Sequence, residues 1–194
     1  MIFLISLARA TQRRIDSLNI LERTGFAFEL VEAHDGHLEP DLPRHSECWS
    51  MRSTEVAAFY SHARAMRRIL DEGLPHGLIL EDDFEFHPGF DLDWIKAHLP
   101  SDCDFASLHD LSYPGMESEI ASHGPKFHRL SRYGLMTVGY LVSSRFVQHF
   151  HDHCLPCRVP IDHQFRLLSE TTHDLAFYQL SDPKVTGRGV DSTL

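Results

Sequence analysis

Three consecutive carboxylates, Glu81, Asp82 and Asp83, directly follow a short apolar run that begins at Gly77. The run has the length of a buried strand in an α/β sheet, and such folds bind ligands beyond the carboxyl ends of their strands. Because side chains alternate along a strand, Glu81 and Asp83 are expected on one face and Asp82 on the other. Neighbouring carboxylates repel one another and suit a hard cation, Mg²⁺ or Mn²⁺. The alternative is a solvated acidic turn.

A helix is expected upstream of these carboxylates. Apolar residues recur at helical spacing from Val56 to Leu70. Ser53 or Thr54 could cap the start of this helix, and Gly73 would end it. The acidic run is therefore predicted to follow a helix and a strand in close succession.

The segment from Thr54 to Phe86 resembles the signature of glycosyltransferase family 25, the lipooligosaccharide and lipopolysaccharide galactosyltransferase-like proteins. That family carries a Gly-Glu-x-Gly-Cys-x-x-Ser-His helix followed by a Leu-x-Glu-Asp-Asp strand. Only small-residue positions differ, and none of them bears acid-base or metal chemistry. The matching residues are Glu55, Ser61, His62, Leu80, Glu81, Asp82 and Asp83, and the differing ones are Thr54, Ala57 and Ala58.

Further stretches resemble the same family in the same order. The first strand and its turn match, with Ser6 and Ala8 where the family has Asn and Asp. Together these stretches extend the resemblance over almost the whole chain. They are Ile2 to Arg9 with Arg13 and Arg14, then Ala33-His34-Asp35-Gly36, Met136 to Ser143, and Val159-Pro160-Ile161-Asp162-His163.

Composition narrows the function classes. The chain has 194 residues, 42% of them hydrophobic, which is enough for one core and one domain, 1–194. Within it we expect a nucleotide-binding part at about 1–110 and an acceptor-side part at about 111–194. A formal net charge of −10 argues against a nucleic-acid partner.

The expected location follows from hydropathy and charge order. No apolar run approaches the roughly 20 residues of a spanning helix. Arginines follow the first apolar strand, which is the reverse of a secretory signal. We therefore expect a cytoplasmic protein with at most peripheral contact with the inner membrane, and reduced cysteines.

Strands and helices are expected to alternate along the chain, which predicts a mostly parallel central sheet flanked by helices. The resemblance narrows this α/β class to a GT-A-like nucleotide-sugar-binding fold. Residues 112–125 are expected to form a loop, and the tail from Ser181 is Gly-rich and polar. The expected strands are Ile2–Leu7, Phe26–Val31, the run from Leu78, Phe105–His109 and Leu135–Ser143. Five helices are expected. The first is capped by Thr11 and ends at Gly25, the second begins near Ser53, and the third runs from an Asp93 cap to Leu99. The fourth runs from a Ser143 or Ser144 cap to His153, and the fifth spans Ile161–Glu170.

The resemblance implies an inverting transfer of a hexose, galactose from UDP-galactose, onto a lipooligosaccharide or other surface-glycan acceptor. Such a donor leaves as a diphosphate, whose charge cations stabilise. We assign the Mn²⁺ or Mg²⁺ ligands to Asp83 and Glu81, and contact with donor hydroxyls to Asp82.

Other donor contacts are expected at the first two strand ends. Arg9 and Arg13 lie where a strand end meets a helix start, which favours phosphate, and the alternative is a solvated helix face. Asp35 could bind a nucleoside hydroxyl and Gly36 could permit close backbone approach, or the pair could form a plain turn. The resemblance adds Ser6, Leu7, Ser61 and His62, and the alternative for His62 is a hydrogen-bonded packing histidine.

An inverting transfer needs a general base for the acceptor hydroxyl. The candidates are Asp162, Asp110 and His163. Asp162 could instead cap a helix, and His163 could orient another group or bind metal. Two other classes of function stay open, a donor-binding protein without transfer activity and a metal-dependent hydrolase.

A second cluster, His149 to Cys157, combines three histidines with a Cys-x-x-Cys pair. Such a set could hold zinc or form a redox pair. No second Cys pair at finger spacing supports zinc, and the alternative is a plain helix end.

Overall fold

The computed structural model describes residues 1–48, 50–110, 121–123 and 126–189. Within them, an eight-stranded sheet forms the centre of the molecule. Its strands are β1 (Ile2–Ser6), β2 (Phe28–Glu32), β3 (His76–Glu81), β5 (Phe105–Ser107), β6 (Ala121–His123), β7 (Phe127–Arg129), β8 (Gly139–Ser143) and β9 (Phe177–Leu180). Their order in the sheet is β2-β1-β3-β8-β5-β9-β7-β6.

The sheet is mostly parallel. Tracing the pairings along the sheet shows that β8 and β7 run against the other six strands. In the parallel group, Ser6 of β1 pairs with Glu32 of β2, and Ile5 pairs with Glu81 of β3. The carboxyl ends of β1, β2 and β3 therefore meet at one edge of the sheet.

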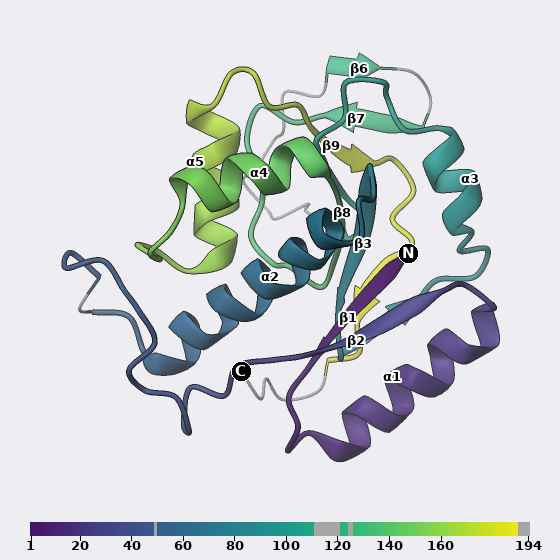
Figure 1. Ribbon diagram of the computed structural model, residues 1–194. Coiled ribbons are helices and arrows are strands. Elements are labelled where there is room, and N and C mark those ends of the chain that lie inside the picture. Colours follow the sequence, from purple (N-terminus) through teal and green to yellow (C-terminus); the bar gives the residue numbers. More distant parts are fainter. Residues whose placement is uncertain (49, 111–120, 124–125, 190–194) are drawn as a thin grey trace.

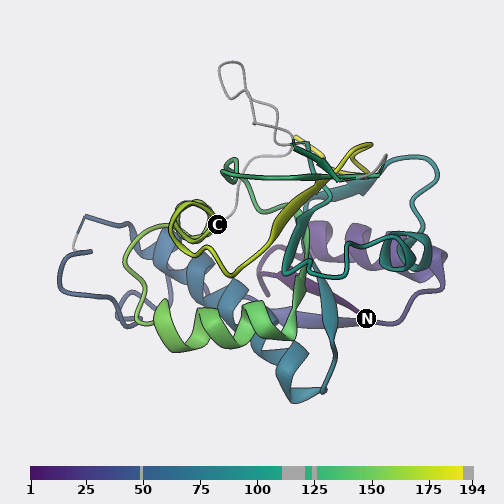
Figure 2. The same cartoon turned by 90° about the horizontal axis from the view of Figure 1, so that it is seen from above.

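Helices cover both faces of the sheet (Figure 1). On one face lie α2 (Ser53–Asp71), α4 (Ser144–His153) and α5 (Ile161–Thr171), and on the other lie α1 (Thr11–Thr24) and α3 (Leu92–Ala97). The view from above in Figure 2 shows the same separation of α4 and α5 from α1 and α3. In the described part of the chain, no helix combines the length and apolar character needed to cross a membrane.

Two apolar cores lie on the two faces of the sheet. Ile79 belongs to the core beneath α2, α4 and α5, while its neighbours Leu78 and Leu80 belong to the core beneath α1 and α3. Because β3 is buried on both faces, its sequence is continuously apolar rather than alternating. This burial fixes the position of the acidic residues that follow.

A short two-stranded sheet lies beside the main one. It pairs β4 (Phe84–Phe86) with β10 (Val185–Gly187) in antiparallel fashion. The acidic run was predicted as the end of a single strand, but β3 ends at Glu81 and a turn at Asp82 and Asp83 precedes β4. The tail was predicted to be merely polar, yet it supplies β10.

The helix boundaries test the predicted caps. Gly25 ends α1 with a φ of 71°, and the Ser143 hydroxyl accepts a hydrogen bond from the Phe146 amide at the start of α4, both as predicted. Other caps were misplaced by one or two residues. The N-cap positions are Ala10 rather than Thr11, Arg52 rather than Ser53 or Thr54, and Asp91 rather than Asp93.

Several strand boundaries also differ from the predictions. β2 begins at Phe28 rather than Phe26, and β8 begins at Gly139 rather than Leu135. β5 ends at Ser107, beyond which His109 forms only an isolated bridge to Val185. In the predicted loop, residues 121–123 form β6, and the rest of the segment lies outside the described residues.

Candidate active site

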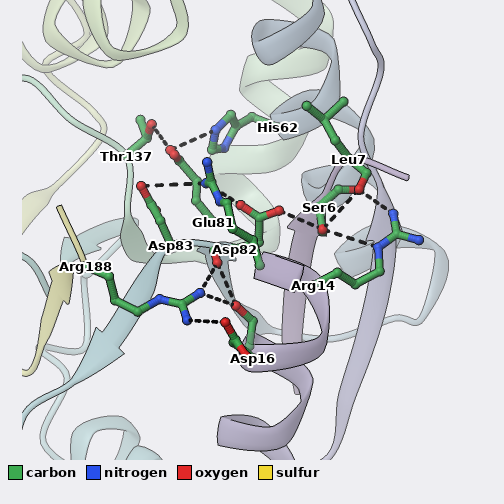
Figure 3. A network of polar contacts seen from close by, with 12 residues as sticks. Ser6, Leu7, Arg14, Asp16, His62, Glu81, Asp82, Asp83, Thr137 and Arg188 are labelled. Atoms are coloured by element: carbon green, nitrogen blue, oxygen red, sulfur yellow. Dashed lines mark hydrogen bonds and ion pairs between the residues drawn. The ribbon is translucent and has the colours of Figure 1, made fainter. Parts of the chain in front are cut away.

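The turn at Asp82 and Asp83 directs three carboxylates in different directions. Figure 3 shows Glu81 turned toward His62 and Thr137, with Asp82 on the side of Ser6. Burial, and after it the negative charge of Glu81, raises the pKa of Asp83. The strand on which Glu81 and Asp83 were predicted to share a face ends before Asp83.

Glu81 is fixed by a chain of polar contacts. One carboxylate oxygen accepts a hydrogen bond from the Thr137 hydroxyl and lies 3.3 Å from Nε2 of His62. Nδ1 of His62 lies 2.8 Å from the Tyr140 hydroxyl, and the imidazole is 1% exposed. Burial alone would raise the pKa of Glu81, but the contacts with His62 and Thr137 outweigh it and lower that pKa. Glu81 is thus held as a carboxylate.

Asp82 is occupied by partners within the protein. Its carboxylate accepts a 2.7 Å hydrogen bond from the Ser6 hydroxyl and forms an ion pair with Arg13. Its backbone carbonyl accepts a 2.6 Å hydrogen bond from the Ser17 hydroxyl. Arg14 binds the Ser6 carbonyl, with a 2.8 Å hydrogen bond from Nη2. Asp82 therefore joins the ends of β1 and β3 to the start of α1.

Asp83 is partly buried and keeps one oxygen without a partner in the described part of the chain. Its Oδ1 is buried and has no hydrogen-bond partner among the described residues, and Oδ2 lies 3.8 Å from Nη2 of Arg13. Burial, then Glu81, raises the pKa of Asp83, so a nearby positive charge would stabilise its carboxylate. No group of three or more His, Cys, Asp or Glu in the described part of the chain is arranged to hold a metal. A cation at Asp83 would therefore need ligands beyond the described His, Cys, Asp and Glu side chains.

A pocket of about 250 Å³ opens beside Glu81. It lies between the start of α2 and the start of α5, and it brings Asp162 to the same cavity as Glu81 and His62. Since pockets that enclose drug-sized ligands measure roughly 300–1,000 Å³, this one suits a small group at the end of a larger molecule. It is lined by Arg52, Thr54, Glu55, Ala58, His62, Glu81, Thr137, Pro160, Ile161 and Asp162.

The three candidate bases differ in position. Asp162 is half-buried in the pocket wall, and its Oδ1 accepts a 2.8 Å hydrogen bond from the His163 amide. It is not the helix cap, because Pro160 occupies the N-cap position of α5. His163 and Asp110 are exposed, and neither lines the pocket.

A second, smaller depression lies at the ends of β1 and β2. It is lined by Leu7, Arg9, His34, Asp35, Gly36, Thr54 and Ala57, and shares Thr54 with the first pocket. Nε of Arg9 lies 2.5 Å from the Asp35 carboxylate, and this contact holds the pKa of Asp35 below its usual value. The predicted donor residues Leu7, Arg9, Asp35 and Gly36 are thus brought together.

The close approach of two backbones explains Gly36. A Cβ at this position would lie 2.5 Å from the backbone carbonyl carbon of Ser53, so any side chain would collide with the first residue of α2. Ser61 ties the same loop to α2, because its hydroxyl accepts a 2.9 Å hydrogen bond from the His34 amide. The Ser61 contact is therefore with the loop that carries Asp35.

Some residues of the site were absent from the sequence-based prediction. Thr137 and Tyr140 both lie in the Thr-x-Gly-Tyr stretch, so the motif itself could have indicated them. Ser17 and Arg188 contact the acidic turn as well, but they lie on α1 and in the polar tail, where no pattern points to them.

The second predicted cluster does not assemble a site in the described part of the chain. Cys154 and Cys157 are free, buried thiols, and burial raises their pKa values to about 12 and about 11. His149 and His153 contact each other along α4, with ring centroids 4.6 Å apart. The zinc and redox alternatives therefore gain no support from the geometry.

Comparison with known proteins identifies similar sequences. A model of a family described as "Glycosyltransferase family 25 (LPS biosynthesis protein)" matches residues 1–165. Lacto-N-neotetraose biosynthesis glycosyltransferase LgtB of Neisseria meningitidis is 29% identical over 169 residues, covering 76% of this chain and 59% of the relative. Inactive glycosyltransferase 25 family member 3 of Mus musculus is 30% identical over 161 residues, covering 73% of this chain and 27% of that protein. The chain thus spans less than two thirds of each relative.

A solved structure supports the fold. The crystal structure of A197 from STIV superposes with a TM-score of 0.54 at 11% sequence identity, covering 98% of this chain and 85% of that one. At this identity the likeness concerns the fold alone. The predicted GT-A-like α/β class, with a mostly parallel sheet between helices, is confirmed.

Proposed function

The chain belongs to glycosyltransferase family 25, and from this premise we propose that it transfers a hexose from a nucleotide sugar to a glycan acceptor. The observation that carries the proposal is the pocket of about 250 Å³, which is lined by Asp162 of α5, Glu81 at the end of β3 and His62 of α2. Such a pocket offers a carboxylate for the acceptor next to an acidic edge for the donor. The specific donor that we propose is UDP-galactose, and the acceptor is a lipooligosaccharide or other surface glycan.

The donor is proposed to lie across the ends of β1, β2 and β3. Asp35 is proposed to meet the nucleoside, with Arg9 paired to it on the side of the diphosphate, and Arg13 lies beside the acidic turn. A guanidinium matches the oxygens of a phosphate, so Arg9 and Arg13 would bind the diphosphate. Arg13 is already held by Asp82, which fixes its direction before the donor arrives.

We propose that the reaction depends on Mn²⁺ or Mg²⁺, with Asp83 as the principal protein ligand and Glu81 nearby. The buried, unpartnered Oδ1 of Asp83 fits this role. When bound, the cation would neutralise charge that develops on the leaving diphosphate. Glu81 is also held by His62 and Thr137, so its first effect is to fix the shape of the acidic edge.

The chemical step is proposed to be an inverting displacement. Asp162 takes the proton of the acceptor hydroxyl, the acceptor oxygen forms a bond to the anomeric carbon, and the bond from that carbon to the diphosphate breaks. UDP leaves with the electron pair. Of the three predicted bases, Asp162 is supported by its place in the pocket wall.

The test is an incubation of the purified protein with a panel of UDP-hexoses, Mn²⁺ and glycan acceptors. Acceptor-dependent release of UDP supports the proposal, and release without acceptor at an equal rate would indicate a hydrolase instead. Donor binding without turnover would indicate a donor-binding protein without transfer activity. The mouse relative is named as an inactive member of the family. A cytoplasmic location with at most peripheral membrane contact stays a prediction.

A further inference from the structure

The tail of the chain returns to the acidic turn. Residues 184–188, here called the strap, include β10, which pairs with β4 directly after Asp83. The strap is also joined to the main sheet, because the Lys184 and Val185 amides donate hydrogen bonds of 2.9 and 3.1 Å to the Leu108 carbonyl. The strap lies beyond residues 1–165, which the family model matches.

A glycine provides the space in which the strap packs. Val185 is fully buried, and a Cβ at Gly139 would lie 2.7 Å from Val185 Cγ1. Gly139 is the first residue of β8 and belongs to the Thr-x-Gly-Tyr stretch. The close packing of Val185 on Gly139 therefore fixes the strap against the strand that neighbours β3.

Arg188, the last residue of the strap, binds the backbone of the acidic turn. Its amide donates a 2.7 Å hydrogen bond to the Asp83 carbonyl, and its Nη2 donates to the Asp82 carbonyl. The same Nη2 lies 2.9 Å from the Ser17 hydroxyl, and Nη1 lies 3.7 Å from the Asp16 carboxylate. Figure 3 shows Arg188 reaching the turn from the side opposite to His62.

These contacts fix two consecutive carbonyls and hence the orientations of the two peptides that flank Asp83. The orientations of these peptides decide where the Asp83 side chain points. Asp82 then faces Ser6 and Arg13, while Asp83 keeps one buried oxygen without a partner among the described residues. We infer that Arg188 is a positioning residue, which holds the acidic turn in the shape that receives the diphosphate of the donor.

This inference rests on the proposed function and adds a residue from outside the matched part of the chain. Arg188 does not need to touch the donor, because its contacts are with the backbone that carries Asp83. Its guanidinium donates to one carbonyl and one hydroxyl at once, which a lysine ammonium at the end of a flexible stem reproduces only in part. Arg188→Lys is therefore expected to be intermediate between Arg188→Met and the parent.

The test compares Arg188→Met and Arg188→Lys with the matched control Arg68→Met. Arg68 lies on α2 far along the helix from the turn, and it loses ion pairs with Glu29 and Glu72 when truncated. In Arg188→Met the dissociation constant of UDP with Mn²⁺, measured by calorimetry, should rise at least about tenfold, and that of Arg188→Lys should rise less. The KM for acceptor should stay within about twofold, and Arg68→Met should bind UDP like the parent.

A second measurement decides the positioning role without any ligand. Hydrogen exchange of residues 82–87 should become at least about tenfold faster in Arg188→Met and remain parental in Arg68→Met. Unchanged exchange together with parental UDP affinity would overturn the inference. Faster exchange with parental UDP affinity would also overturn it, because the shape of the turn would then have no effect on donor binding. If the parent itself binds no UDP-sugar, the proposed function fails, while the exchange result still shows whether Arg188 holds the turn.

Discussion

Two regions of the molecule differ in the side chains that surround their polar atoms. One is the acidic turn of Glu81, Asp82 and Asp83, and the other is the His/Cys segment from His149 to Cys157. The carboxylates of the turn meet side chains from β1, α1, α2 and the segment before β8. In the His/Cys segment, His149 and His153 contact each other on one helix, and the two thiols are buried. Both clusters are dense in groups that can bind metal, but charged and hydroxyl side chains from several elements meet only at the first, whereas the Cys157 thiol donates to the Pro43 carbonyl.

This difference indicates that a site is marked by polar side chains that converge from several elements, rather than by the number of metal-binding residues within one segment. The turn keeps one buried oxygen, Oδ1 of Asp83, without a partner in the described part of the chain. A buried unpaired oxygen is costly unless a ligand compensates it. The thiols of Cys154 and Cys157 carry no comparable cost, because burial keeps them protonated, with pKa values of about 12 and about 11. The turn therefore keeps an oxygen that a ligand would stabilise, whereas the buried, protonated thiols need no ligand.

The largest effect is expected from Asp83→Asn. If the unpartnered oxygen serves the diphosphate through a cation, this change should abolish measurable turnover and remove the Mn²⁺ dependence of UDP binding. Calorimetry with UDP in the presence and absence of Mn²⁺ measures both. A variant that binds UDP and Mn²⁺ like the parent would show that Asp83 holds no cation. The acidic turn would then differ from the His/Cys segment in its contacts but not in its function.

The same substitution should raise the Tm of the protein without cation at pH 7. Burial, then Glu81, raises the pKa of Asp83 in the folded state, so stability falls as the pH rises through that folded pKa. Asn stays neutral and avoids this loss. The gain should disappear below the ordinary aspartate pKa of 3.8, where the carboxyl is protonated in both states. Thermal scans at both pH values separate this effect from a general packing change.

The next effect concerns the pocket beside the turn. Asp162→Asn should lower kcat by about 10²–10⁴-fold and leave UDP-sugar binding nearly unchanged, because the base is needed for the acceptor proton only. Since Pro160 is the N-cap of α5, and an amide oxygen can still accept the His163 amide, the loss of stability should be small.

Asp110→Asn is the matched control for this base. Asp110 is exposed and does not line the pocket, so its kcat should stay near the parental value. A steep loss in Asp110→Asn with little change in Asp162→Asn would transfer the role of base to Asp110.

The order and type of most elements could be predicted from the sequence. The apolar run of β3, the amphipathic spacing of α2 and the Gly25 stop are local signals, and each of them was sufficient. The break after Glu81 could not be predicted, because it depends on the pairing of β4 with the distant strand β10. Strand ends are decided by partners that the local pattern does not contain.

The candidate site likewise has residues that the sequence could indicate and residues that it could not. Motif positions such as His62 and Asp162 line one pocket. The internal engagement of Asp82 with Ser6 and Arg13 was not foreseen, since spacing alone does not say which carboxylate faces a protein cation. Arg188 was missed for a stronger reason: a single arginine in a polar tail has no pattern, and its role follows only from the return of the chain to the turn.

A smaller effect should follow from Arg9→Ala. Arg9 lies at the shallow depression, on the donor side of the acidic turn, and its loss should weaken UDP while leaving uridine nearly unchanged. A charge-assisted contact contributes about 1.5–3 kcal/mol, or roughly 10- to 150-fold in affinity. Arg64→Ala is the control, because Arg64 binds the Glu32 carbonyl nearby but lines neither cavity. Equal losses for UDP and uridine would indicate a packing defect instead.

The smallest effect is expected in the His/Cys segment. His149→Ala combined with His153→Ala should leave kcat and UDP affinity within about twofold of the parent, because neither ring contacts the acidic turn or lines either cavity. The native thiols should react slowly with a disulfide reagent at pH 8, where a group of pKa about 11 is ionised to only about 0.1%. All four cysteines should react at once in denaturant, which provides the control for reagent and count. Two results would contradict this expectation: rapid labelling of Cys154 or Cys157 in the native protein, or zinc that the parent retains and the double variant loses. Either would show that this segment also holds a reactive site. Convergence of side chains from several elements would then not be the feature that separates the two regions.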